Sequence, residues 1–160
     1  AYKQNDKVLG ESAGMIMQGM DYAALKFVDT KEEGVVLQYV TCEKAEKGKA
    51  EKIVKQVAIK TSKQPQPYTV KYAVDEIPSS RIATQDVWLR VKVHSKGIAN
   101  QIQAIAEWSY SLDGKKFIKI GNPFTVREGK WIGAKLGFFN TRTAKKNDAA
   151  FFDIDWIHFE

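Results

Sequence analysis

Two acidic residues near the C-terminus are the first candidates for chemistry. Asp153 and Asp155 lie two positions apart in the alternating run Phe151–Phe159. On a β-strand such residues share one face, with backbone positions roughly 6.5–7 Å apart. This spacing fits the acid and base of an inverting glycosidase. It also fits calcium, because carboxylates suit a hard cation. A structural calcium site, or hydrogen bonds to adjacent loops, is favoured over catalysis.

Two runs of alternating sequence form a second group of candidates. In Asp86–His94 and Trp131–Phe139, apolar residues alternate with residues that carry indole, charge or no side chain. An exposed indole suits stacking on the C–H face of a sugar ring, while neighbouring polar groups bond its hydroxyls. The predicted carbohydrate-binding residues are Trp88, Arg90, His94, Trp131 and Lys135. One alternative stays open: both tryptophans pack under a loop or against a neighbouring domain.

The remaining reactive residues do not form a catalytic pattern. His94 and His158 are isolated and lack the ligand spacing of a zinc site. Cys42 is the one cysteine, so it cannot form an internal disulfide and is expected to be a buried thiol. No phosphate-binding loop, nucleophile elbow or dinucleotide fingerprint occurs. The residues therefore predict a domain with no catalytic residues and no cofactor other than the possible calcium.

The elements that position these residues are predicted to be strands. Period-two alternation recurs about every ten residues, which favours an antiparallel β-sandwich or barrel, and the same pattern along the chain predicts one domain over residues 1–160. Asp113-Gly114 predicts a type I′ hairpin. Trp108 and Tyr110 are expected in the core. The predicted strands are Ser12–Gly19, Tyr22–Val28, Gly34–Glu43, Lys52–Ile59, Tyr68–Ala73, Asp86–His94, Ala104–Leu112, Lys115–Ile120, Trp131–Phe139 and Phe151–Phe159.

The same alternation assigns side chains to the core. In Trp131–Phe139 the buried set is Ile132, Ala134, Leu136 and Phe138, and in Asp86–His94 it is Val87, Leu89, Val91 and Val93. In the last run we expect Phe152, Ile154 and Trp156 to be buried. Glu43–Gln56 is charged and interrupted by Gly48, so it is expected to be a polar loop that enters a strand.

The types and distribution of the charged residues argue against a nucleic-acid partner. The net charge is +6, from 21 lysines and four arginines against 19 acidic residues. Arginine is the preferred residue for forked contacts to phosphate and guanine. The lysines are also interleaved with acidic residues, as on a solvated surface. No nucleic-acid partner is predicted, although a basic module that binds nucleic acid or uronic-acid polymers stays an alternative.

No stretch has the roughly 18 apolar residues of a membrane span, so no membrane partner is expected. No signal peptide opens the chain, and an exported protein would carry its targeting segment outside these 160 residues.

Five segments, in order along the chain, resemble one known family. The most specific is WSYSLDGKKF at 108–117, followed by Ile120-Gly121 and Phe124. The others are AGMIM at 13–17, GMDYA at 19–23, GKWIGAKLGFF at 129–139 and FFDIDWI at 151–157. Together these resemble the C-terminal concanavalin A-like β-sandwich of family 43 glycoside hydrolases, the bacterial β-xylosidases and α-L-arabinofuranosidases.

The resemblance implies a jelly-roll sandwich of two sheets, a bacterial source and an extracellular or periplasmic location. It implies a non-catalytic accessory module that binds xylan or arabinoxylan, or that supports a catalytic propeller domain carrying the carboxylates. Alternatives are a purely structural module without sugar affinity, and a glycosidase in its own right. Family modules usually begin with a further strand or two, so an N-terminal edge strand is expected to be missing, shortened or supplied by another chain.

Overall fold

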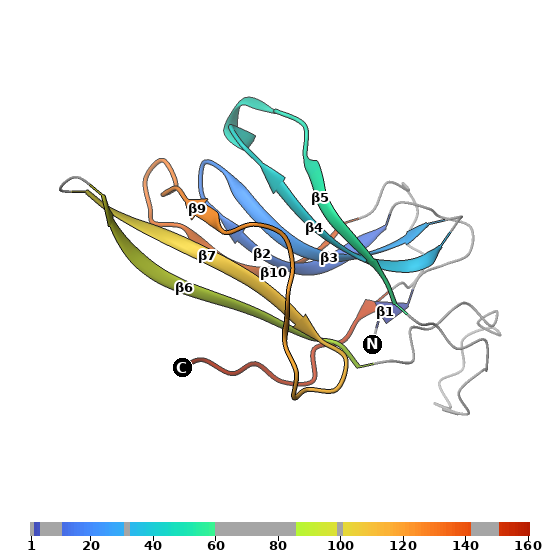
Figure 1. Cartoon of the computed structure of the whole chain (residues 1–160). Helices are drawn as coiled ribbons and strands as arrows, with labels where there is room; N and C mark the ends of the chain where they lie inside the picture. The colour runs from blue at the N-terminus through green and yellow to red at the C-terminus, as the bar shows by residue number, and fades with distance from the viewer. Residues whose placement is uncertain (1, 4–10, 31–32, 60–85, 99–100, 142–150) are drawn as a thin grey trace.

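The computed structural model describes residues 2–3, 11–30, 33–59, 86–98, 101–141 and 151–160, and these form antiparallel sheets (Figure 1). The five-stranded sheet has the order β10-β2-β3-β4-β5. Its strands are β2 (Ser12–Gln18), β3 (Tyr22–Thr30), β4 (Gly34–Cys42), β5 (Lys52–Ala58) and β10 (Lys135–Thr141). The predicted all-β antiparallel class is confirmed.

The second sheet is built around β7. Strand β6 pairs along the whole of β7, while β8 and β9 pair with different parts of it. Its strands are β6 (Trp88–Ile98), β7 (Gln101–Ser111), β8 (Ile118–Lys119) and β9 (Phe124–Val126). A third pair joins β1 (Tyr2–Lys3) to β11 (Phe151–Phe152). One 3-10 turn, η1 (Ala45–Lys47), lies between β4 and β5.

The core lies between the inner faces of the two larger sheets. Alternate residues of β2, β3 and β4 meet alternate residues of β7, as the period-two pattern predicts. Trp108 and Tyr110 are buried, as predicted, and the rings of Tyr39 and Trp108 lie 6.2 Å apart. The buried cluster is Ala13, Met15, Met17, Ala23, Leu25, Phe27, Val35, Leu37, Tyr39, Ile59, Ala106, Trp108, Tyr110, Ile120 and Phe124.

The turn between β8 and β9 is shaped around one core ring. Gly121 has a φ of +70°, which favours glycine, and a Cβ added there would lie 2.1 Å from the Tyr39 ring. The Tyr39 hydroxyl donates a hydrogen bond to the Asn122 carbonyl oxygen at 3.1 Å. Burial raises the Tyr39 pKa to about 12, so this hydroxyl keeps its proton at physiological pH.

The prediction for Trp131–Phe139 is wrong in its start and in most of its buried set. The strand begins at Lys135, and Ile132 lies exposed in the loop before it. Leu136 and Phe138 point to the inner side, opposite Met17 and Met15 of β2, yet each is about two-fifths exposed. Among the described residues β10 is at the edge of its sheet, so these side chains have a described neighbouring strand on one side only. Alternation reports the face of a strand but not its place in the sheet.

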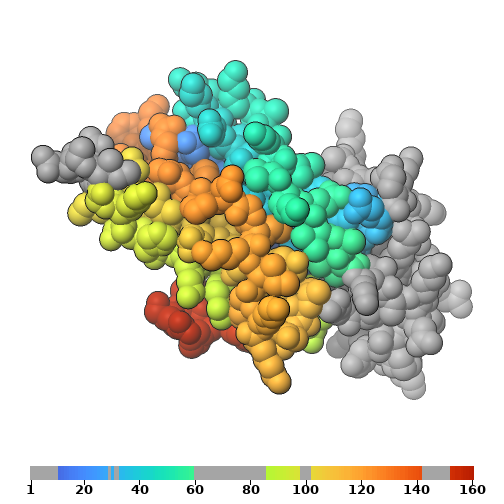
Figure 2. Space-filling view, viewed as in Figure 1, coloured from blue at the N-terminus to red at the C-terminus, as the bar shows by residue number. Residues whose placement is uncertain are grey.

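The C-terminal prediction is wrong in a similar way. Phe152 packs on the core, 6.1 Å from the Phe27 ring, but strand pairing ends there. Ile154 and Trp156 are exposed by 41% and 60% because no ladder continues past the two-residue β1 partner. In Figure 2 the C-terminal residues stand out at the lower edge of the sandwich.

Three smaller differences concern β6, β9 and the 113–114 turn. Val87, Leu89 and Val91 pack on the core, but Val93 is 51% exposed. Strand β9 has only three residues, too short for a periodic pattern. Gly114 has the positive φ expected of it, but Asp113 does not, so the turn is not type I′.

The predicted strand Tyr68–Ala73 lies outside the described residues. The expectation of a missing or shortened N-terminal edge strand stays a prediction, because residues 4–10, between β1 and β2, also lie outside them. Within the described part, no helix is long and apolar enough to cross a membrane.

Substitution of Gly121 tests the fit of this turn to the core. Gly121→Ala should lower the free energy of unfolding by about 2 kcal/mol or more, because it adds both a strained φ and a clash with Tyr39. Gly48→Ala is the matched control: Gly48 has a φ of +68° but nothing within 4 Å of an added Cβ, so only the φ cost of about 1 kcal/mol applies. Guanidinium titration measures both, and equal losses would contradict the packing argument.

Candidate functional site

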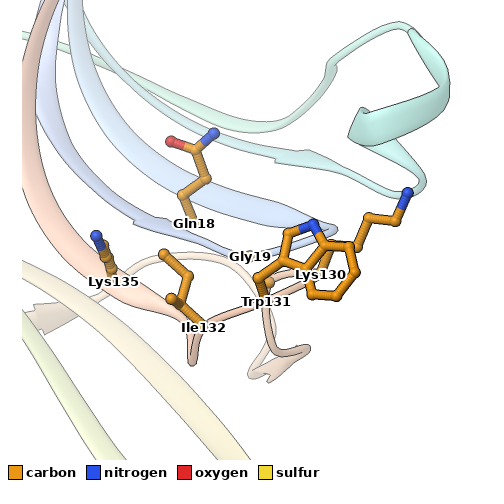
Figure 3. Close-up of a pocket in the computed structure, with 7 residues that line it drawn as sticks. Gln18, Gly19, Lys130, Trp131, Ile132 and Lys135 are labelled. Atoms are coloured by element: carbon orange, nitrogen blue, oxygen red, sulfur yellow. The ribbon is translucent and has the colours of Figure 1, made fainter.

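A pocket of about 430 Å³ opens between the β2–β3 turn and the segment that precedes β10 (Figure 3). In that view Gln18, Ile132 and Lys135 lie on one side of the hollow, Trp131 and Lys130 lie on the other, and Gly19 lies between them. We call this the Trp131 pocket. Its lining residues are Gln18, Gly19, Gly129, Lys130, Trp131, Ile132 and Lys135.

Two neighbouring strands place the polar side chains of the pocket. Gln18 of β2 and Lys135 of β10 are directly opposite each other in the ladder. Their chain neighbours Met17 and Leu136 point to the inner side, so Gln18 and Lys135 point to the outer face. The first polar residues of the pocket therefore come from the rigid end of the five-stranded sheet.

The loop that carries Trp131 is fixed by a buried carboxylate. Asp21 is 6% exposed, and each of its oxygens lies 3.1 Å from a guanidinium nitrogen of Arg127. The Asp21 carboxylate also accepts a hydrogen bond from the backbone N–H of Lys44 at 2.6 Å. One side chain thus joins the β2–β3 turn, the loop before η1 and the segment after β9.

Backbone contact completes this attachment. Met20 donates its N–H to the Glu128 carbonyl oxygen at 3.0 Å. A Cβ added to Gly19 would lie 1.8 Å from the Arg127 carbonyl oxygen, so only glycine allows the two backbones to come so close. The segment that leads to Trp131 is therefore held by a side-chain ion pair and by a backbone hydrogen bond.

Trp131 itself is 88% exposed, which is unusual for the largest apolar side chain. The Lys130 ammonium lies 5.9 Å from the centre of its ring, a weak cation–π contact. Gly133, two residues on, has no atom within 4 Å of an added Cβ, so the loop is also open at this position. The indole offers a free apolar face beside amide and ammonium groups.

The other predicted sugar-binding residues lie on a different sheet. Trp88, Arg90 and His94 are on β6, whereas Trp131 and Lys135 line the pocket beside β2. The Trp88 ring packs on Gly114, where an added Cβ would lie 3.0 Å from it, and is partly buried. The Arg90 guanidinium carbon lies 3.4 Å from the centre of the Phe117 ring. His94 is exposed on the same strand.

The turn that covers Trp88 is built by one carboxylate. Asp113 accepts hydrogen bonds from the backbone N–H groups of Lys115 and Lys116 at 2.8 and 2.9 Å, and from the Ser111 hydroxyl at 2.8 Å. The N–H of Lys116, then that of Lys115, lower the pKa of Asp113 because they stabilise its charged form. This bonding also explains why Asp113 keeps a negative φ.

Asp153 and Asp155 are exposed and follow the end of β11, so the predicted strand face does not form there. Among the described residues, no three His, Cys, Asp or Glu side chains gather where they could hold a metal ion. Calcium binding stays a prediction. Cys42 is buried, as expected, with its sulfur 3.1 Å from the Lys49 carbonyl oxygen.

A polar cluster adjoins the pocket on the outer face of the sheet. Tyr22, opposite Gln18 in the ladder, donates its hydroxyl to Glu51 at 3.0 Å, and Lys26 forms an ion pair with the same carboxylate. Burial, then the charge of Glu51, raises the Tyr22 pKa well above its usual range. The Tyr22 hydroxyl therefore remains a hydrogen-bond donor at any physiological pH.

The sequence prediction named Trp131 and Lys135, which both line the pocket, but not the residues that hold the loop. Asp21 and Arg127 are 106 positions apart, and local spacing does not reveal such pairs. The motifs at 19–23 and 129–139 contained the available signal, since they adjoin the two contacting segments. Gln18 and Lys130 have ordinary polar types and become site residues only through the fold.

The fold is an antiparallel β-sandwich, and its surface carries an exposed indole beside the Trp131 pocket. The family model described as the C-terminal concanavalin A-like domain of β-xylosidase, of glycoside hydrolase family 43, matches residues 3–160. The chain belongs to this family. The resemblance and the concanavalin A-like architecture expected from the sequence are confirmed.

A curated relative supports the same assignment. A β-xylosidase of Formosa agariphila is 38% identical over 79 residues, which is 49% of this chain and 12% of that protein. The chain therefore spans a small part of the relative that it matches. No solved structure is significantly similar to the chain.

Loss of Arg127 should loosen the Trp131 loop. Arg127→Ala leaves the buried Asp21 carboxylate without its guanidinium partner, and we expect a loss of about 1–3 kcal/mol in the free energy of unfolding. Arg127→Lys keeps the positive charge but not the guanidinium, one nitrogen of which lies 3.1 Å from both Asp21 oxygens, so it should lose less. Urea titration compares the two, and an Arg127→Ala variant as stable as the native chain would refute this anchoring role.

The Asp113 turn predicts a pH dependence with a definite sign. A carboxylate with a lowered pKa stabilises the fold above its ordinary pKa of about 3.9, and this contribution is lost as pH falls through the lowered value. The native chain should have a higher Tm than Asp113→Asn at pH 6, and the gap should narrow below about pH 4. Calorimetry across this range measures it; a gap that stays constant would contradict the assignment.

Proposed function

We propose that the chain is a non-catalytic accessory module of a family 43 glycoside hydrolase, and that its Trp131 pocket binds xylan-type polysaccharide. The observation that carries this proposal is the 88% exposure of Trp131 on a loop anchored through Asp21 and Gly19. Exposing an indole forfeits the favourable burial of a large apolar surface. A fixed loop that presents one is best explained by a ligand that covers it.

The pocket chemistry supports a sugar as that ligand. An indole face matches the C–H face of a pyranose ring, and binding sites commonly combine an aromatic wall with a few placed polar groups. Gln18 supplies an amide that both donates and accepts, as sugar hydroxyls require. Because the sugar ring rests on a preformed surface, the protein orders few side chains on binding.

The parent protein in this proposal is a family 43 glycoside hydrolase whose catalytic carboxylates lie outside this chain. The family match and the curated β-xylosidase support this assignment. The family resemblance implies a bacterial source. Because xylan and arabinoxylan lie outside cells, the proposal also implies an extracellular or periplasmic location.

Packing against a catalytic domain is a second candidate role, favoured by a separate observation. The C-terminal segment exposes four large apolar side chains: Ile154, Trp156, Ile157 and Phe159. Apolar exposure of this density is typical of a surface that meets another protein. The Trp131 pocket and the C-terminal segment can serve the two roles separately.

Affinity electrophoresis of the 160-residue chain tests the sugar-binding role. Soluble xylan or arabinoxylan in the gel should retard the native chain, and Trp131→Ala should weaken binding at least tenfold, about 1.4 kcal/mol. Trp156→Ala is the matched control, since it removes an exposed indole outside the pocket and should migrate like the native chain. Mobility unaffected by either polysaccharide would rule out sugar binding and leave the packing role.

A further inference from the structure

The Trp131 pocket has a one-sided charge. Two of its seven lining residues are lysines, and none is acidic. In the described part of the chain, Lys26 pairs with Glu51, Lys119 with Glu107 and Arg127 with Asp21, while most of the other lysines have no carboxylate partner. Lys130 and Lys135 have no carboxylate at ion-pair distance among those residues.

We propose that the Trp131 pocket selects an anionic sugar residue, one whose ring carries a carboxylate or a sulfate ester. This inference rests on the proposed function, because it names the substrate class of the same pocket. Trp131 contacts the ring, the Gln18 amide bonds a hydroxyl, and Lys130 and Lys135 attract the acidic group.

The two lysines line the hollow from different sides. Figure 3 places Lys130 and Lys135 on opposite sides of the hollow, with the indole beside Lys130. A lysine is a mobile point charge, so it meets a carboxylate or a sulfate equally well, whereas a forked guanidinium favours a planar partner. A neutral sugar ring would leave both ammonium groups unused.

The charge of the whole chain acts in the same direction. A net charge of +6 raises the local concentration of an acidic polysaccharide and speeds its association. This general attraction is weak and is screened by salt over roughly 10 Å at 0.1 M. Selection by the pocket must therefore be separated from attraction by the overall charge.

Calorimetric titration with short sugars makes that separation. The probes are xylotetraose, a xylo-oligosaccharide of equal length with one glucuronic acid branch, and the same oligosaccharide with one sulfate ester. At about 50 mM NaCl the native chain should bind an acidic sugar about tenfold more tightly than xylotetraose, equal to about 1.4 kcal/mol. The glucuronic and sulfated probes show which acid is preferred, and preference for either supports the proposal.

Charge variants locate the effect. The double substitution Lys130→Gln with Lys135→Gln should abolish the preference, so that the variant binds xylotetraose and the acidic sugars with equal affinity. Lys115→Gln with Lys116→Gln, an equal charge change on the turn after β7, should preserve the preference. Loss of preference in both double variants would mean general charge attraction and would overturn the inference.

The failures of the two proposals are distinguishable. Equal affinity of the native chain for neutral and acidic sugars overturns the anionic preference but leaves sugar binding intact. Absence of binding to all three probes overturns both.

Discussion

Trp108 and Tyr39 meet in the space between the two sheets, and the rest of the structure is arranged around that contact. Both side chains are almost completely buried, with their rings 6.2 Å apart. Truncating a buried tryptophan typically costs about 3–5 kcal/mol, a large part of a domain's stability. Because these rings occupy the interior, the turn at Gly121 must approach without a side chain. Strand β9 follows this turn with the core residue Phe124, and the chain leaves the core after β9.

That departure determines where the candidate site can form. After β9, the backbone of Arg127 and Glu128 passes directly over Gly19 and Met20, and the Asp21–Arg127 pair holds it there. The chain must then return to begin β10 at Lys135, opposite Gln18. The intervening residues have no strand partner, so Trp131 projects into solvent. An exposed indole on an anchored loop is thus a direct result of the connection between the two sheets.

The sequence predicted the elements well where alternation and burial agree. The predicted bounds of the central strands β2, β3, β4 and β7 agree with the structure within a few residues. Each of these strands has a paired strand on both sides and buries one face in the core, so its sequence alternates clearly. Prediction was poorer at the edges. Leu136 and Phe138 point to the inner side, as predicted, but lie on a strand at the edge of the sheet and stay partly exposed. Ile154 and Trp156 lie after the last paired residue of β11 and are exposed. Periodicity describes the chain locally and contains no information on which strand is at an edge.

In the candidate site, too, local sequence predicted some features and tertiary structure decided the others. Trp131 is exposed as predicted, although it lies in the loop before β10 and not on a strand, whereas Trp88, on a similar pattern, packs against Gly114. The difference arises from Asp113, whose hydrogen bonds fold the following turn over β6. Likewise, Asp21 and Arg127 act together only because of the fold. Residue types suggested the chemistry, and tertiary contacts decided which of those residues could perform it.

The central claim is that Trp131, among the four tryptophans, presents its indole to a ligand. A ¹H–¹⁵N correlation spectrum resolves the four indole N–H signals, each assignable by substitution. On addition of a xylo-oligosaccharide, with or without an acidic branch, the account predicts that the Trp131 signal shifts in a saturable manner while those of Trp88 and Trp108 stay in place. A saturable shift of the Trp88 signal with Trp131 unaffected would contradict it.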